Sequence, residues 1–224
     1  MIQRGSWLIL SVLLNAFGNA LTIKAALGSA PWTAASLNLS NMFGMTVGEM
    51  LIIMGSVVLL GDDLLRRHWN GMRDVYNFLY VLSFGSVVDL WLKIMTPLNL
   101  DLLPFQAMAC VTGILCIGAA LSIYFRVNLV LHPFDDLLKI LREKYVHGNV
   151  VIAQYISLGI PLSLGLMIGL VRGHLLGISF GTVVSFLCTG YFILLFDKLI
   201  HLHFENSKGR HAPWRVLHAK HFKA

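Results

Sequence analysis

Residues 18–32 read GNALTIKAALGSAPW, and residues 118–134 read GAALSIYFRVNLVLHPF. In both stretches a run of small residues leads into a turn that ends in proline and an aromatic residue. Further matches follow in the same order along the chain: GSVVLLG at 55–61 with GIPLSLG at 159–165, and Asp89 with Asp197. This shared order predicts a duplicated chain, with one repeat at about 7–95 and the other at about 105–200.

The composition places the chain in a membrane. Of its 224 residues, 57% are hydrophobic and only 12% are charged, and the mean hydropathy is +0.74. Soluble domains carry about 25% charged residues, because a surface in water needs them. We therefore expect an all-α, polytopic membrane protein with about six transmembrane helices, each near the length that spans a bilayer. The expected spans are 7–25, 47–60, 75–95, 105–125, 150–171 and 177–199.

The charges predict how these spans are oriented. With the amino terminus in the cytoplasm, only Lys24, Lys93 and Arg172 of the 17 lysines and arginines fall on the outer side. The positive-inside rule then predicts a multi-pass plasma-membrane protein with both termini cytoplasmic. Each repeat holds an odd number of spans, so the two halves are expected to be inverted, as in secondary transporters. Residues 1–200 form the transmembrane domain, and the basic, His-rich tail at 201–224 would meet anionic lipids.

Two short helices are expected after the repeated turns, beginning at Pro31 and Pro133. Proline at a first helical position loses only an amide that has no partner within the helix. The segment 133–147 is amphipathic, which predicts an interfacial helix, and Asp135 with Lys139 gives a supporting i,i+4 pair. The segment 31–43 is almost uncharged and is either re-entrant or interfacial.

The segments LGSAPWTAASLNLSNMFGMTVGEM at 27–50 and GISFGTVVSFL at 177–187 carry a family pattern. The order of a small-residue helix, a Pro-Trp turn, a short helix and a Val-Gly segment resembles the bacterial YczE/YyaS/YitT-like integral membrane proteins. That family has Asp after the Pro-Trp pair, where this chain has Thr33, and Gly before the second proline, where this chain has His132. The resemblance implies membership of the family more than it implies a mechanism.

The repeated stretch supplies candidates for a solute path. Lys24 and Arg126 lie near the ends of equivalent helices, where they either snorkel to the headgroups at little cost or form a cationic pair that would suit an anionic solute. Together with the two turns, the solute-path candidates are Lys24, Pro31, Trp32, Arg126, Pro133, Phe134 and Asp135.

Three carboxylates are candidates for coupling to protons or ions: Glu49, Asp89 and Asp197. Burial would raise the pKa of such a group toward physiological pH, although paired interfacial carboxylates are also ordinary in membrane proteins. The runs DDLLR at 62–66 and DDLLK at 135–139 resemble metal-binding aspartate motifs. Each ends in a basic residue, so salt pairing at helix ends explains them without a metal.

Two functions are carried forward. The first is a small permease that moves a small solute, an anionic one being an option, by alternating access between the halves. The alternative is a non-transporting accessory or regulatory membrane protein that supports a partner enzyme or exporter through the segment 133–147 and the tail. We expect no enzyme activity, metal, cofactor or nucleic-acid partner, because no motif for them is found. The chain is small for a permease, which makes a homodimer an option.

Overall fold

A computed structural model describes residues 2–67, 69, 71–127 and 129–200, so the predicted tail at 201–224 lies outside it. The described part is built from helices, and the all-α prediction is confirmed. The helices are α1 (Ile2–Ala25), α2 (Pro31–Phe43), α3 (Val47–Arg66), α4 (Gly71–Ile94), α5 (Leu103–Val127), α6 (Pro133–Ile140), α7 (Val150–Arg172) and α8 (Phe180–Leu199). A π-helical turn, Leu141–Tyr145, follows α6 directly.

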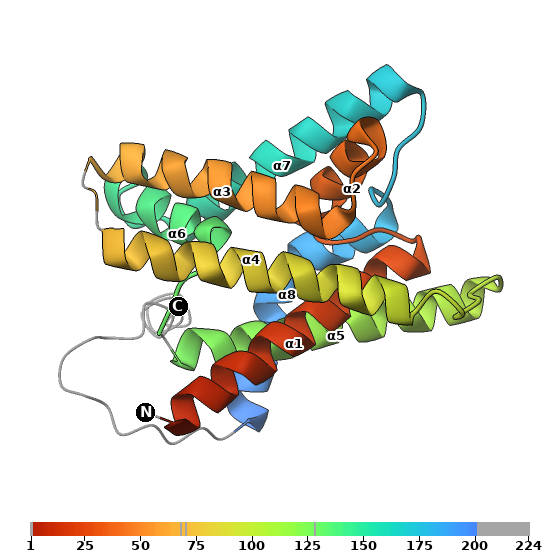
Figure 1. Cartoon of the computed structure of the whole chain (residues 1–224), viewed down its shortest axis with the longest axis horizontal. Helices are drawn as coiled ribbons and strands as arrows, with labels where there is room; N and C mark the ends of the chain where they lie inside the picture. The colour runs from red at the N-terminus through yellow and green to blue at the C-terminus, as the bar shows by residue number, and fades with distance from the viewer. Residues whose placement is uncertain (1, 68, 70, 128, 201–224) are drawn as a thin grey trace, which may run out of the picture.

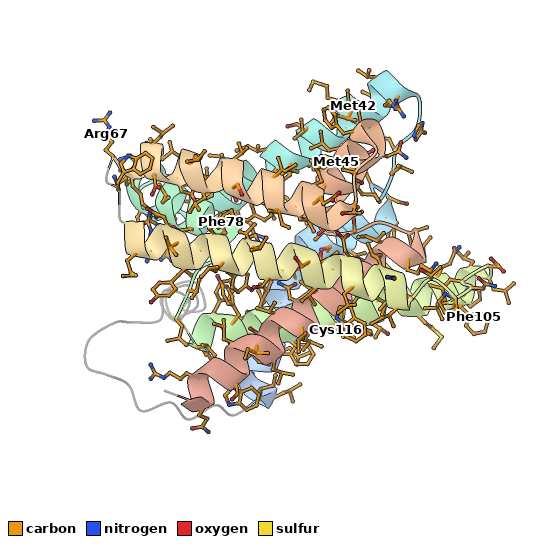
Figure 2. The ribbon with its side chains drawn as sticks, viewed as in Figure 1. Met42, Met45, Arg67, Phe78, Phe105 and Cys116 are labelled. Atoms are coloured by element: carbon orange, nitrogen blue, oxygen red, sulfur yellow. The ribbon has the colours of Figure 1, made fainter. Side chains whose placement is uncertain are left out.

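Five of the described helices are long and apolar enough to cross a membrane, namely α1, α4, α5, α7 and α8. The helices α2 and α3 meet at an angle of 114° and form a sixth candidate if they are one broken span. Large apolar side chains such as Phe78 and Phe105, which are 41% and 54% exposed, project outward from the bundle (Figure 2). An outer surface of this kind belongs in lipid, so the chain is a multi-pass membrane protein.

Small residues allow α1 and α5 to cross closely (Figure 1). A Cβ atom built on Gly18 would lie 2.6 Å from the carbonyl oxygen of Gly113, and one built on Gly113 would lie 2.7 Å from that of Gly18. Ala16 and Ala20 on the same helix are fully buried. The two backbones therefore touch, as small-residue contacts allow in membranes.

The other helix contacts lie partly within each half of the chain and partly between the halves. The helix α4 packs against α1, and α8 packs against α5. In the same way α2 of the first half packs against α7, and α6 of the second half packs against α3. These pairs are equivalent under the predicted duplication, whereas a two-fold axis in the membrane plane stays a prediction.

The helix α6 begins inside the bundle. Its N-cap residue, His132, lies with its ring 5.3 Å from that of Tyr80 and 5.4 Å from that of Phe84, measured between ring centroids. Both aromatic residues belong to the middle of α4, which has 24 residues and is about 36 Å long. The start of α6 thus lies level with the middle of a membrane span, rather than along the surface that the amphipathic pattern predicts.

Candidate solute-binding site

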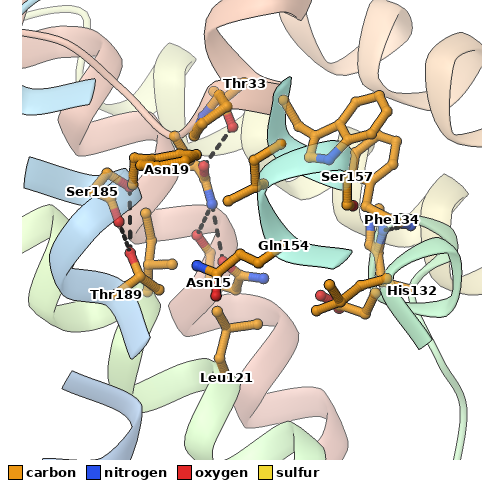
Figure 3. A pocket seen from close by; sticks show the side chains of 18 of the residues that line it. Asn15, Asn19, Thr33, Leu121, His132, Phe134, Gln154, Ser157, Ser185 and Thr189 are labelled. Atoms are coloured by element: carbon orange, nitrogen blue, oxygen red, sulfur yellow. Dashed lines mark hydrogen bonds between the residues drawn. The ribbon is translucent and has the colours of Figure 1, made fainter. Parts of the chain in front are cut away.

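A cavity of about 180 Å³ lies where the first turns of α2 and α6 meet (Figure 3). The indole of Trp32 stacks on the ring of Phe134, with 3.9 Å between the ring centroids and 4° between the planes. Pro31 and Pro133 occupy the first helical positions just before these rings. The two turns that the sequence repeats are therefore brought together, and Pro31, Trp32 and Phe134 line the cavity.

One wall of the cavity is a ladder of amides on α1. The Nδ2 of Asn19 donates to both the backbone oxygen and the Oδ1 of Asn15, each at 2.9 Å. The Oγ1 of Thr33 then donates to the Oδ1 of Asn19 at 2.6 Å, which ties α2 to α1. Buried amides in a membrane need such partners, because an unsatisfied polar group is costly in an apolar medium.

The opposite walls come from the second half of the chain. Gln154 and Ser157 on α7 and Ser185 and Thr189 on α8 add amide and hydroxyl groups between apolar side chains (Figure 3). The cavity is thus apolar with a few polar groups from several helices, which is the usual make-up of a small-molecule site. The sequence analysis did not identify these four residues as candidates for a solute site. Polar side chains in apolar helices, such as Asn15 and Asn19 four residues apart, were the available signal.

The first turn of α6 places Asp135 in the cavity wall. No side chain in the described part of the chain donates a hydrogen bond to this carboxylate. Burial, followed by the neighbouring carboxylate of Asp136, raises the pKa of Asp135 to about 7. Tyr80 and Tyr124 are further titratable groups near Asp135, and both are uncharged phenols.

His132 lines the cavity as a neutral ring, since burial lowers its pKa to about 3. Its Nδ1 accepts a hydrogen bond from the amide of Phe134 at 3.2 Å, so the proton is on Nε2. Trp32 is 8% exposed, and its Nε1 has no hydrogen-bond partner among the described residues. His132 thus brings an N–H donor to the cavity wall, whereas the Nε1 of Trp32 is itself buried. Thr33 and His132, where this chain departs from the family pattern, both lie in the wall.

The other solute-path candidates lie away from the cavity. The Nζ of Lys24 donates to the backbone oxygen of Thr96 at 3.3 Å, beyond the end of α4. The Nε of Arg126 donates to the backbone oxygen of Ser122 at 2.9 Å and lies 3.3 Å from a carboxylate oxygen of Asp197. Pro133 is buried at the start of α6 but is not part of the lining. Lys24 and Arg126 therefore do not form a pair.

The three coupling candidates hold helix ends and also lie outside the cavity lining. Glu49 closes a capping box with Thr46, where its Oε2 accepts from the Thr46 amide at 2.8 Å. Asp89 accepts from the hydroxyl of Thr46 at 2.5 Å and from the amide of Gly48 at 2.7 Å, which fastens α4 to the start of α3. Asp197 accepts from the hydroxyl of Ser122 at 2.7 Å and pairs with Arg126.

The two aspartate runs form ion pairs between helices. Arg66 of α3 pairs with Asp136 of α6, and Arg73 of α4 pairs with Asp63 of α3. The basic residue at the end of the first run, Arg66, thus pairs with an aspartate of the second run, because α3 and α6 pack side by side. Asp62, Asp63 and Asp136 are all buried. Neither carboxylate oxygen of Asp62 has a hydrogen-bond partner in the described part.

Comparison with known proteins gives a family and two relatives. The profile of a family of unknown function, DUF6198, matches residues 2–198. The "Uncharacterized membrane protein YczE" of Bacillus subtilis (strain 168) is 27% identical over 191 residues, which cover 85% of this chain and 83% of the relative. The "Uncharacterized protein YyaS" of the same organism is 23% identical over 202 residues, covering 90% and 96%. No solved structure matches. The resemblance to YczE and YyaS proteins is thus confirmed, and the link to YitT proteins stays a prediction.

Proposed function

This chain belongs to the DUF6198 family of membrane proteins, and we propose that it is a small permease that binds a solute in the central cavity and moves it by alternating access. The observation that carries the proposal is the cavity itself. It is lined by both halves of the chain at the meeting point of two helix starts. Secondary transporters commonly place their sites at such a junction, near the middle of the membrane.

The proposal includes an orientation and a path. Both termini would face the cytoplasm, because Lys and Arg gather on that side of the predicted spans. The cavity would open alternately to the two sides as the halves rock, with the Trp32–Phe134 stack at the centre. The alternative, an accessory protein that transports nothing, needs no access to this cavity from either side.

Cysteine labelling tests the proposed solute path and does not require that the solute is known. Ser157 is buried in the cavity wall, and Gly159 on the same helix is outside the lining. In a chain whose native cysteines Cys110, Cys116 and Cys188 are replaced by alanine, Ser157→Cys and Gly159→Cys would be compared. A membrane-impermeant maleimide is added to vesicles of each orientation.

If the protein is a permease, the cysteine at 157 should react from each side of the membrane, and the cysteine at 159 should react from neither side. Reaction of the cysteine at 157 from one side only would argue against alternating access. Reaction from neither side would favour the accessory function, provided that both variants reach the membrane in equal amounts.

A further inference from the structure

We propose that the solute of this cavity is a small organic cation, a protonated amine of about one ring in size, which the carboxylate of Asp135 binds. The inference rests on the proposed function and names the class of its solute. It also differs from the expectation of an anionic solute, which depended on Lys24 and Arg126 lying together on the path. Neither of these two residues reaches the cavity.

The cavity has room for a small solute. Sites for drug-sized ligands measure about 300–1,000 Å³, whereas an apolar cavity of about 150 Å³ in another protein holds benzene. The present cavity, at about 180 Å³, therefore accommodates one ring with a short polar arm.

The charge in the wall sets the sign of the solute. Asp135 is the one residue with a formal charge in the lining of the described structure, because no lysine or arginine contributes and His132 is neutral. A carboxylate at this depth is costly unless it is paired, and ionisable residues inside membranes commonly mark solute or ion paths. An ammonium group in the cavity would supply the partner that the described residues do not provide.

The walls around this carboxylate suit a cation. Trp32 and Phe134 present stacked rings to the cavity, and Phe84 adds a third ring from α4. An ammonium group within about 6 Å of an aromatic centroid gains cation–π attraction, which grows when water is excluded. The same rings would cover the apolar part of the solute.

The two helix starts act in the opposite direction, but more weakly. A helix amino terminus carries about half an elementary charge, spread over several amide groups. The first turn of α6 already contains Asp135 and Asp136, which offset its dipole. Once a cation pairs with it, Asp135 carries a full charge, which therefore determines which solute the cavity prefers.

Three probes of similar shape separate the charge from the size: benzylamine, benzyl alcohol and benzoate. Their affinities for the purified full chain would be measured by titration calorimetry in one detergent. Gly190→Phe places a large side chain at the exposed edge of the cavity and should obstruct it, because Gly190 lines the cavity and a Cβ atom there meets nothing within 4 Å. Gly159→Phe is the matched control, since its Cβ is equally unobstructed but lies outside the lining. Binding that survives in Gly190→Phe measures partition into the detergent.

We expect benzylamine to bind at least about tenfold more tightly than benzyl alcohol, and benzoate to bind weakest. Asp135→Asn should reduce benzylamine affinity about tenfold or more and leave benzyl alcohol unchanged, and Asp135→Glu should restore part of the preference. Equal or tighter binding of benzoate or benzyl alcohol would overturn the cation proposal and leave the cavity as a solute site. If Gly190→Phe abolishes the binding of none of the three probes, the cation proposal is refuted. The permease proposal is then judged separately, by the labelling of the cysteine at 157.

Discussion

Replacing Gly18 with alanine should force α1 and α5 apart at their crossing point. The new Cβ would lie 2.6 Å from the carbonyl oxygen of Gly113 and 2.9 Å from the Cγ1 of Ile117, whereas ordinary contact begins at 3.4 Å. The carbonyl belongs to the backbone and cannot rotate away as a side chain can. The two helices must therefore separate by about 0.8 Å at this point.

The energetic cost follows from two opposing effects. Alanine in a helix interior gains up to about 1 kcal/mol over glycine through helix propensity. Overpacking of a close contact costs about 1–3 kcal/mol. Gly61→Ala in α3 gains the propensity term alone, because a Cβ atom there meets nothing within 4 Å. The difference between the two variants isolates the contact, and it corresponds to roughly 2–12 °C in Tm for a chain of this size.

The assay is thermal unfolding of the purified full chain, followed by circular dichroism in one detergent. Gly18→Ala should unfold at a lower temperature than Gly61→Ala, and its benzylamine affinity should fall, because α1 carries the amide ladder of Asn15 and Asn19. If the two variants unfold within about 1 °C of each other, the helices do not touch at Gly18, and the closeness of the crossing is refuted.

Three further predictions concern charged groups. Benzylamine affinity should fall about tenfold per pH unit below pH 7, because the amine stays protonated while Asp135 gains a proton. Calorimetry at several pH values checks this, and the dependence of affinity on pH should vanish in Asp135→Asn. Arg66→Ala should cost about 3–5 kcal/mol of unfolding free energy, because it leaves the buried carboxylate of Asp136 without its cation. The unfolding of this variant should be compared with that of Arg67→Ala, and equal stability would argue against the buried pair. Asp89→Asn should lower Tm while leaving benzylamine affinity intact, since Asp89 fastens α4 to α3 and is not part of the lining. Loss of affinity at unchanged Tm would restore Asp89 as a coupling candidate.

The sequence predicted those features that depend on local pattern. Apolar length gave the membrane spans, and proline at a first helical position gave the starts of α2 and α6. The repeated turns directed attention to Trp32 and Phe134, and the structure stacks these two rings in the cavity wall; their role in a solute site stays a prediction. Asp135 was included among the solute-path candidates because it follows the second of these turns.

The features that depend on packing could not be predicted in the same way. Asp136 has the sequence surroundings of an exposed helix-end charge, and only the contact between α3 and α6 buries it against Arg66. The entry of α6 into the bundle depends on His132 meeting Tyr80 of a distant helix. Asn15 and Gln154 line one cavity although they come from opposite halves of the chain. Their positions in the sequence do not indicate that the two side chains are close in space.

The exchange of partners between the halves has a consequence for how this protein is made. Since α2 packs on α7 as well as on α3, the first half leaves the ribosome without one of the surfaces that α2 contacts in the finished fold, whereas α3 already has α4 as a partner. The amide groups at the start of α2 would meet lipid if that helix settled early, and lipid offers them no partner. Insertion of α2 therefore has to await synthesis of the second half. Two fragments divided at the loop between α4 and α5 should mature only when they are produced together in one cell, and a chaperone that holds the first fragment would find α2 as its exposed element.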